Sequence, residues 1–229
     1  MSEYPVMPMV ADSVKRAMDV VGSITALIVT LPLMGGIAAI IWIAMGRPIL
    51  YAQMRPGLHE HRFRIWKFRT MTDARNAEGH LLPDSERLTP LGRWLREFSL
   101  DELPQLLNVL IGDMSLVGPR PLLVRYIDRY THRQRRRHDV KPGITGWAQV
   151  NGRNAVDWAT RLEHDVWYVE NRSLALDCRI LFLTFRGLWL RSGVLAGAGA
   201  ELDEFWGTLG VPQNGPRALP VEADEQRSV

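Results

Sequence analysis

The sequence predicts an α-rich α+β fold, with a membrane-inserted re-entrant helix-break-helix, a short β-hairpin and amphipathic interfacial helices around a small globular core. Three observations predict it: an uncharged apolar run with a central proline, two strand-like segments around a Pro-Gly pair, and later segments with amphipathic helical spacing. The predicted organisation is an N-terminal segment over residues 1–47, with the re-entrant helix at about 14–46, a globular domain over 48–191, and an acidic tail over 192–229.

Charge and cysteine content narrow the class of protein. The tail holds six acidic and two basic residues, a net of −4, which leaves +7 on residues 1–191. A basic body indicates phosphate-rich partners such as nucleic acid, anionic lipid or a nucleotide, and the tail, rich in Gly, Ala and Pro, is expected to be loosely packed. The single cysteine, Cys178, excludes an internal disulfide framework, and its apolar surroundings predict a buried, unreactive thiol.

A long hydrophobic segment lies near the N-terminus. Val20–Met45 has 26 residues and no charge, and a membrane span needs about 20 apolar residues. Membrane insertion is therefore the leading interpretation, and the alternative is a fully buried helix of a soluble protein. A secretory signal peptide fits poorly, because the run is long and starts late in the chain.

Three features favour a re-entrant hairpin over a straight span. Pro32, close to Gly35 and Gly36, interrupts the middle, where proline removes a backbone hydrogen bond and kinks a helix. Each half is about 18–20 Å long, shorter than a hydrocarbon core of ~30 Å. Basic residues, which favour the cytoplasmic face, flank the segment on both sides. They are Lys15, Arg16, Arg47, Arg55, Arg62, Arg64, Lys67 and Arg69.

The segments that follow predict the hairpin and a helix. Residues 48–70 contain two strand-like runs around a Pro56–Gly57 turn. A helix is expected from Thr89-Pro90 through Phe98, with the proline in its first turn.

The stretch SLDELPQLL, residues 99–107, places two acids side by side before a Leu-rich run. Ser-x-x-Glu is the capping-box pattern, in which Ser99 caps a helix and Glu102 bonds back to the Ser99 backbone N–H. Asp101 would then lie in the first turn, where the helix dipole favours a negative charge. The two acids form a helix start, a reactive pair, or both. Pro104 makes this helix start irregular.

Arg120 stands between two prolines that fix its backbone, and a helix is expected to begin at Pro121. An arginine at a rigid turn beside a helix N-terminus suits an anion site, although taken alone it reads as an ordinary surface residue. The expected helix ends in the basic run HRQRRRHDVK, residues 132–141. This run is either a solvated helix face or a surface for nucleic acid or anionic lipid, and lipid fits better beside an inserted segment.

The segment KPGITGWAQVNGRN, residues 141–154, contains three glycines that allow a ligand to approach the backbone, and Arg153 is a second candidate phosphate ligand. Neither the dinucleotide-binding glycine pattern nor the P-loop pattern occurs. Helices are expected at about 157–170 and 174–190. Two arginines in the second speak against a membrane span, so it is either an interfacial helix or one that packs on the core.

Three motifs in the same order resemble one enzyme family. KFRTM at 67–71, LDELPQLLNVLIGDMSLVGPRP at 100–121 and KPGITGWAQVNGRN at 141–154 are similar to the bacterial sugar transferases, the monotopic polyprenyl-phosphate phosphoglycosyl transferases of the PglC/WcaJ type. The resemblance covers about residues 15–191, and the chain looks like the small PglC-like members.

The resemblance implies an activity and its setting. A UDP-sugar would donate its sugar-1-phosphate to a polyprenyl phosphate, usually undecaprenyl phosphate, with Mg²⁺, a covalent intermediate on an Asp, and release of UMP. The implied location is the cytoplasmic face of the bacterial inner membrane, where a monotopic anchor holds the protein. The implied partners include anionic membrane lipids and a second copy of the chain in a homo-oligomer, but no nucleic acid. The alternative is a membrane-anchored basic binding module without catalysis, which leaves the paired acids unexplained.

The resemblance also assigns residues. Asp101 maps to the nucleophile and metal ligand, Glu102 to its catalytic partner, and Pro32 to the break in the membrane helix. Leu31 departs from the Ser that many members have there, so help for the freed backbone groups has to come from elsewhere, for instance Thr30. The residues expected to bind the substrate phosphates or the nucleotide are Lys67, Arg69, Arg96, Arg120, Asn151 and Arg153.

Overall fold

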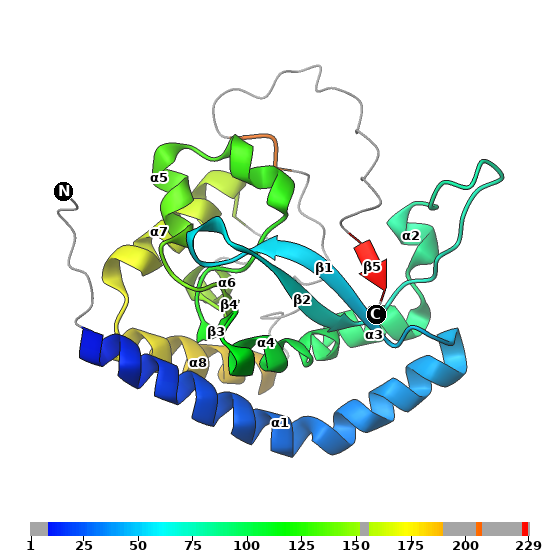
Figure 1. Cartoon of the computed structure of the whole chain (residues 1–229), viewed down its shortest axis with the longest axis horizontal. Helices are drawn as coiled ribbons and strands as arrows, with labels where there is room; N and C mark the ends of the chain where they lie inside the picture. The colour runs from blue at the N-terminus through cyan, green and yellow to red at the C-terminus, as the bar shows by residue number, and fades with distance from the viewer. Residues whose placement is uncertain (1–8, 152–155, 190–204, 208–225, 229) are drawn as a thin grey trace.

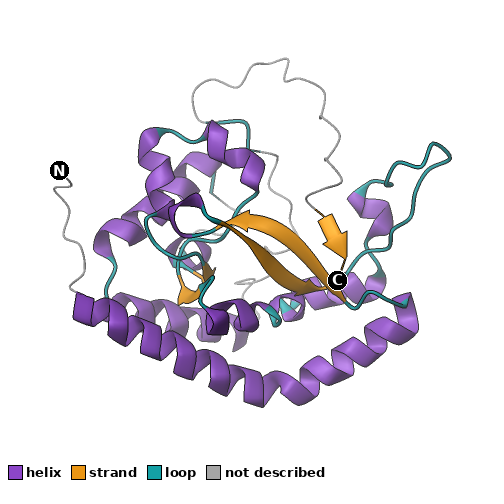
Figure 2. Cartoon of the chain, in the orientation of Figure 1, coloured by secondary structure: helices purple, strands orange, loops and turns teal. Residues whose placement is uncertain are grey.

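Helices dominate the computed structural model, which describes residues 9–151, 156–189, 205–207 and 226–228 (Figures 1 and 2). The helices are α1 (Met9–Met45), α2 (Asp84–Arg87), α3 (Pro90–Glu97), α4 (Gln105–Ile111), α5 (His132–Arg135), α6 (Trp147–Val150), α7 (Trp158–Asn171) and α8 (Leu174–Trp189). The 3-10 helices are η1 (Leu58–Glu60), η2 (Leu100–Glu102), η3 (Val124–Arg129) and η4 (Arg136–His138). The strands are β1 (Leu50–Pro56), β2 (Arg62–Phe68), β3 (Ser115–Val117), β4 (Gly143–Thr145) and β5 (Gln226–Ser228). The predicted helix-rich α+β class is confirmed.

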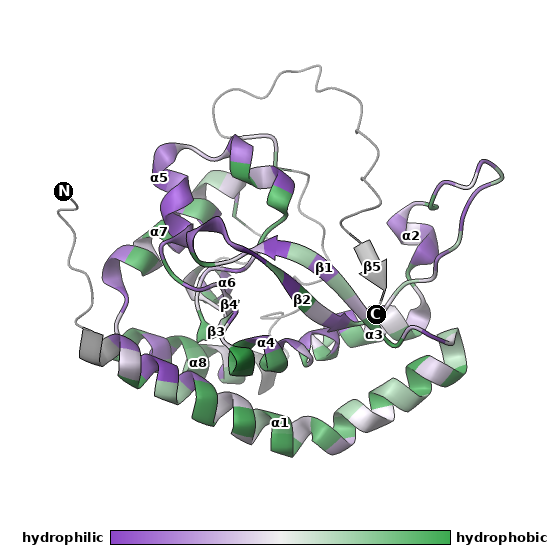
Figure 3. Ribbon diagram, in the orientation of Figure 1, coloured by the Kyte–Doolittle hydropathy of each residue, from purple (hydrophilic) through white to green (hydrophobic). Residues whose placement is uncertain are grey.

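The helix α1 runs along one side of the molecule and bends near its middle (Figure 1). Hydrophobic residues follow one another along most of its length, whereas α5 is largely hydrophilic and the strands of the hairpin mix hydrophilic and hydrophobic residues (Figure 3). The stretch Asp12–Met45 contains an 18-residue apolar window with a mean hydropathy of 2.3, and only 11% of that window is buried. By length and composition it is the one helix of the described residues that could cross a membrane. Re-entrant insertion stays a prediction.

Pro32 lies inside α1, which continues through it as one helix. Proline has no N–H, so the carbonyl of Ile28, four residues earlier, loses its helical donor. The hydroxyl of Thr30 donates to the Ala26 carbonyl at 2.7 Å, not to that of Ile28. Such a bond from threonine to the preceding turn also bends a helix, so Pro32 and Thr30 together account for the bend.

The first half of α1 is tied to the end of α4. The guanidinium of Arg16 donates to the carbonyls of Val109 and Leu110 at 2.7 and 2.8 Å. The last carbonyls of a helix have no donor within the helix, so Arg16 satisfies two of them and fixes α1 against α4.

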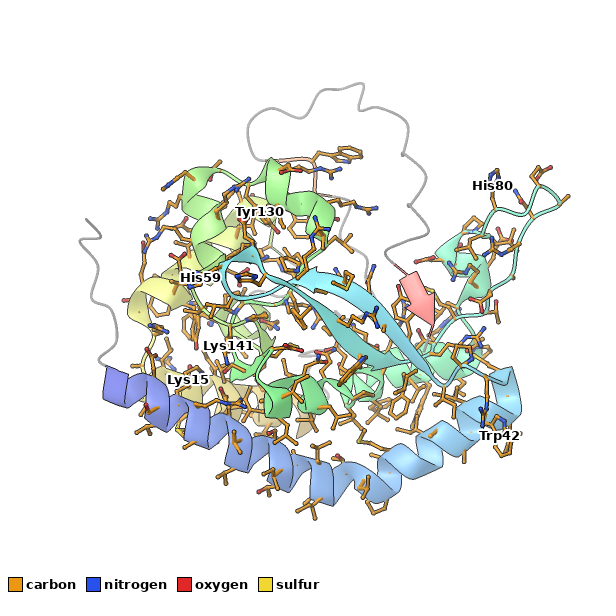
Figure 4. The ribbon with its side chains drawn as sticks, viewed as in Figure 1. Lys15, Trp42, His59, His80, Tyr130 and Lys141 are labelled. Atoms are coloured by element: carbon orange, nitrogen blue, oxygen red, sulfur yellow. The ribbon has the colours of Figure 1, made fainter. Side chains whose placement is uncertain are left out.

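Two further polar side chains, Lys15 and Asp19, join the same half of α1 to α8 and β3. Lys15, which lies between α1 and the rest of the molecule in Figure 4, pairs with Asp177 of α8 at 2.6 Å. Asp19 is buried and accepts from the Ser115 hydroxyl at 3.0 Å and from the Leu116 N–H at 2.9 Å. This half is therefore part of the core.

The second half of α1 packs on the globular domain through apolar side chains. Ile37 and Ile41 form a buried cluster with Phe68 of β2 and Leu95 of α3. Trp42 lies on this arm, far from Lys15 (Figure 4), and is 59% exposed. One face of the second half of α1 therefore packs in the core, while the opposite face leaves large apolar side chains exposed.

The predicted hairpin is confirmed. Strands β1 and β2 pair antiparallel, with Ala52 opposite Trp66, and the chain turns at Gly57. The side chain of Asn108 on α4 accepts from the Trp66 N–H at 3.2 Å and donates to the Arg64 carbonyl at 2.7 Å. This amide fixes α4 against β2.

The helices that follow agree with the sequence in part. Helix α3 is confirmed, with the Thr89 hydroxyl accepting from the Gly92 N–H at 2.9 Å, and α7 and α8 lie where they were predicted. The prediction of a helix starting at Pro121 is wrong, because only the 3-10 helix η3 forms there, from Val124. Cys178 is exposed, so the prediction of a buried thiol is also wrong.

Two glycines predicted to admit a ligand instead allow backbone to meet backbone. Strands β3 and β4 pair in parallel. A Cβ on Gly143 would lie 2.1 Å from the Gly118 nitrogen, and one on Gly146 would lie 2.2 Å from the Gly118 oxygen. The close approach of these chains therefore requires glycine.

Parts of the expected loose tail pack on the domain. Strand β5 pairs antiparallel with β1. Phe205 is 1% exposed and lies in an aromatic cluster, with its ring centroid 5.6 Å from that of Tyr126 and 5.3 Å from that of Trp158. Its backbone carbonyl accepts from Arg129. The expectation of loose packing therefore fails for this residue.

Candidate active site

The two acids, Asp101 and Glu102, lie on η2, a single turn between α3 and α4. Ser99 adopts the left-handed conformation, with φ of 52°, and its side chain makes no cap hydrogen bond, so the capping-box prediction is wrong. Pro104 is the residue before α4 and begins that helix after the acids. Both carboxyl groups are thereby turned inward, where Asp101 is 4% exposed and Glu102 is 6% exposed.

Glu102 is held by two cations. Lys67 of β2 donates to Oε1 at 2.8 Å, and the two terminal nitrogens of Arg120 bond to both carboxylate oxygens. Burial opposes the charged form, but the charges and hydrogen bonds of Arg120 and Lys67 prevail and hold the pKa of Glu102 well below its ordinary value. The same ion pair raises the pKa of Arg120. Three predicted site residues therefore meet at one point.

Asp101 has a different environment. Its Oδ1 atom is buried and has no hydrogen-bond partner in the part of the chain that the structure describes. Burial is the main cause that raises the pKa of Asp101, with a contribution from the charge of Glu102 and an opposing one from Lys67. A carboxylate with an unsolvated, unpaired oxygen is a reactive nucleophile and an available metal ligand.

Arg120 is positioned through its backbone as well as by its flanking prolines. Arg137 donates to the Arg120 carbonyl at 2.7 Å and pairs with Asp165 of α7 at 2.7 Å. The side chains of this pair are 1% and 3% exposed. Sequence reasoning missed both residues, because Arg137 lies in a basic run that reads as a solvated helix face, and burial of one arginine in such a run has no local signal.

This buried pair predicts a stability effect. We expect Asp165→Asn to lower the free energy of unfolding by about 3 kcal/mol or more, because it leaves Arg137 buried without its counter-charge. The measurement is chemical denaturation of the purified protein in detergent. Asp128→Asn is the matched control, since the Asp128 side chain is 94% exposed and lies 4.0 Å from Arg135. Equal stability of the two variants would show that the buried pair contributes little.

For the other predicted phosphate ligands the structure gives no hydrogen bond or ion pair to Asp101 or Glu102 among the described residues. Arg96 donates to the Thr70 hydroxyl at 3.1 Å. The Asn151 amide donates to the Trp147 carbonyl at 3.1 Å. Arg153 lies outside the described residues. None of these predictions is tested by these contacts.

Arg69 holds together the chain that links α1 to the hairpin. Its guanidinium donates to the carbonyls of Arg47 and Met71 at 3.2 and 3.0 Å, and pairs with Asp73 at 2.7 Å. These contacts give Arg69 a structural role, and its predicted contact with phosphate stays a prediction.

A magnesium ion fits this site only with help from substrate. The described residues contain no group of three or more His, Cys, Asp or Glu side chains that could hold a metal. Among the residues that the structure describes, Asp101 offers the one buried carboxylate oxygen without a partner, while Glu102 is engaged by Lys67 and Arg120. Mg²⁺ is commonly bound by one or two carboxylates plus substrate phosphates, so this donor set fits a metal that arrives with a phosphorylated ligand.

Comparison with known proteins gives a consistent answer. A family model described as bacterial sugar transferase matches residues 10–191. The chain is 50% identical over 194 residues to the uncharacterized sugar transferase EpsL of Bacillus subtilis, covering 85% of this chain and 96% of that protein. It is 39% identical to the UDP-N-acetylgalactosamine-undecaprenyl-phosphate N-acetylgalactosaminephosphotransferase of Aeromonas hydrophila, over 82% of this chain and 45% of the relative. It is 40% identical to the undecaprenyl-phosphate galactose phosphotransferase of Salmonella typhimurium, over 78% of this chain and 41% of the relative.

The chain thus spans nearly all of EpsL and less than half of the two longer enzymes. The family match includes α1, the hairpin, the paired acids on η2, and the arginine that holds Glu102. The order of motifs, the site geometry and the match over most of the sequence agree, and the chain belongs to the bacterial sugar transferase family.

Proposed function

We propose that this protein transfers sugar-1-phosphate from a UDP-sugar to undecaprenyl phosphate. The observation that carries the proposal is the contrast within the acidic pair: Glu102 is neutralised by Lys67 and Arg120, whereas Asp101 keeps a buried oxygen free. The names of two relatives, an undecaprenyl-phosphate N-acetylgalactosaminephosphotransferase and an undecaprenyl-phosphate galactose phosphotransferase, support the same substrate class.

The proposed chemistry has two steps. An oxygen of Asp101 attacks the phosphorus that carries the sugar, the bond from that phosphorus to the bridging oxygen breaks, and UMP leaves with the electron pair. An oxygen of undecaprenyl phosphate then attacks the same phosphorus, the bond from phosphorus to Asp101 breaks, and the carboxylate is regenerated. The atoms balance without any further reactant, and the product is a polyprenyl-diphosphate sugar.

The side chains around Asp101 suit this chemistry. Glu102 holds Arg120 and Lys67 beside the nucleophile, and these cations offset the negative charge of an approaching diphosphate. When bound, Mg²⁺ would reduce the repulsion between carboxylate and diphosphate and stabilise the leaving UMP. Asp101 and the phosphate oxygens would hold it. Arg69, Arg96, Asn151 and Arg153 remain proposed contacts to the phosphates or the nucleotide.

Release of UMP tests the proposal directly. Purified protein in detergent, with undecaprenyl phosphate and Mg²⁺, is given UDP-glucose, UDP-galactose, UDP-N-acetylgalactosamine and UDP-N,N′-diacetylbacillosamine in separate reactions. We expect UMP and a lipid-linked sugar with at least one donor, and loss of both on addition of EDTA. No release with any donor would favour the alternative, a basic membrane-anchored binding module without catalysis.

The location we propose is the cytoplasmic face of the bacterial inner membrane, with α1 inserted but not crossing. Large apolar side chains of α1 stay uncovered, including Ile28, Val29, Leu31 and Ile43 at 64–82% exposed. On α8, Phe182 is also exposed although the helix buries Ile180. Both helices therefore have one face in the core and one face suited to lipid.

Topology gives a testable prediction. In a Cys178→Ser background, single cysteines at Ser2 and at the exposed Asp128 should both be protected from a membrane-impermeant thiol reagent in intact cells. Both should react once the membrane is opened. Labelling of Ser2→Cys alone in intact cells would mean a true span with the amino terminus outside. Replacing Pro32 by Ala tests the bend, because a straightened helix should expose the amino terminus in a fraction of molecules.

A further inference from the structure

Arg161 on α7 is a partly buried cation without an ionic partner among the described residues. Its guanidinium lies 5.4 Å from the centroid of the Trp158 ring, one turn earlier on the same helix. Within the described ranges it makes no ion pair and no side-chain hydrogen bond. This ring contact leaves N–H groups of the guanidinium available for a ligand.

Arg161 lies on the face of α7 that is directed at the candidate active site. Residues four apart on a helix share a face, and the residue four after Arg161 is Asp165. Asp165 pairs with Arg137, which in turn donates to the Arg120 carbonyl at 2.7 Å. Arg120 is the arginine that holds Glu102.

The surroundings of Arg161 are positive. Burial first, and the charges of Arg120 and Arg137 in addition, lower the pKa of Arg161 to about 10 against the opposing effect of Asp165. Two acids of the site are already engaged, Asp165 by Arg137 and Glu102 by Arg120. A cation in such surroundings gains stability from an added anion, since none of the acidic side chains that the structure describes forms an ion pair with it.

We propose that Arg161 is a further phosphate-binding residue, which holds a phosphoryl oxygen of the donor diphosphate or of the acceptor phosphate beside Arg120. The assignment rests on the proposed function, because it names a substrate contact within that reaction. Arg120 uses both terminal nitrogens on Glu102, so its capacity for a second anion is limited. Arg161 has the same chemistry without the competing carboxylate, and it lies outside the three motifs that drew attention to the other candidates.

The test compares Arg161→Gln and Arg161→Lys with Arg62→Gln, which removes one exposed charge from β2. Loss of one charge-assisted contact should lower kcat/KM by about 10- to 100-fold, with partial recovery in the lysine variant and no change in the control. A raised KM for the UDP-sugar assigns Arg161 to the donor diphosphate. A raised KM for undecaprenyl phosphate assigns it to the acceptor. Values within twofold of the wild type for both substrates overturn the proposal.

Ligand-free stability separates binding from a structural role. Because Arg161 has no ionic partner, Arg161→Gln should melt at the wild-type temperature or above it, while the rise in melting temperature caused by UDP should shrink. A lower ligand-free melting temperature, with activity loss that follows the unfolded fraction, overturns the proposal.

A direct binding measurement distinguishes failure of this inference from failure of the proposed function. If the wild type releases no UMP, equilibrium dialysis with UDP and with inorganic phosphate still compares it with Arg161→Gln. Weaker binding by the variant supports the phosphate contact, whereas equal binding, or no binding by either protein, overturns it.

Discussion

Asp101→Asn should reduce release of UMP by about 10³-fold or more, because an amide is neither an anionic nucleophile nor a good magnesium ligand. The fold should survive the change. The buried Oδ1 of Asp101 has no partner among the described residues, and burial already disfavours its charge. A neutral side chain of the same shape therefore removes a desolvation cost, and the melting temperature should hold or rise.

Two measurements check this prediction: steady-state release of UMP, and trapping of a sugar-phosphate adduct on the protein from a labelled donor. Asp139→Asn serves as the control, since that side chain is 53% exposed. Near-normal turnover in Asp101→Asn would end the assignment of this residue as nucleophile. Loss of turnover together with a lower melting temperature would point to a structural cause instead.

Glu102→Gln should harm both activity and stability. The substitution removes the anion that holds Arg120 and Lys67, so two cations face each other with only a neutral amide between them. Loss of one partner from a buried ion pair costs about 3 kcal/mol. The positions of both cations beside Asp101 should loosen as well, and we expect a fall in kcat/KM of about 10²-fold.

The control for Glu102→Gln is Glu163→Gln, which breaks an ion pair with Arg133 whose side chains are 48% and 53% exposed. A surface pair of this kind should be worth less than about 1 kcal/mol. The pH dependence adds a second readout, since the pKa of Glu102 is lowered from an ordinary 4.5. Stability from the charged form is complete above pH 4.5 and is lost as the pH falls below it, an effect that should be smaller in the variant. Equal stability curves would contradict the ion-pair account.

Local signals in the sequence predicted the hairpin and the helices α3, α7 and α8 well. The Pro56–Gly57 turn between two apolar runs and the Thr89-Pro90 start each have a mechanism that acts over a few residues. The same local signals gave a wrong prediction around Asp101 and Glu102. Ser99 reads as a helix cap, but it adopts a left-handed conformation, and Pro104 delays the helix until after both carboxyl groups.

Contacts between distant segments were the main source of error. The parallel pairing of β3 with β4 involves three residues in each strand, too few for a pattern. The burial of Arg137 depends on Asp165, 28 residues later. Phe205 fills a largely aromatic cluster built from residues that lie between 43 and 83 positions earlier, from Leu122 to Leu162. Each of these depends on which surfaces meet, and a single sequence without aligned relatives gives no local sign of that.

The contact between Arg16 and the end of α4 has a consequence for how the two substrates meet. The paired acids are separated from α4 by only Leu103 and Pro104, and Arg16 of α1 binds two carbonyls near the end of α4. Seven residues of helix measure about 10 Å, so α4 is a strut of fixed length between the anchor and the reactive carboxylate. With α1 at the lipid surface, as we propose, the carboxylate would stay at one height above it. An isoprenoid phosphate would then find its target by lateral diffusion in a plane, and only the nucleotide would have to search in three dimensions.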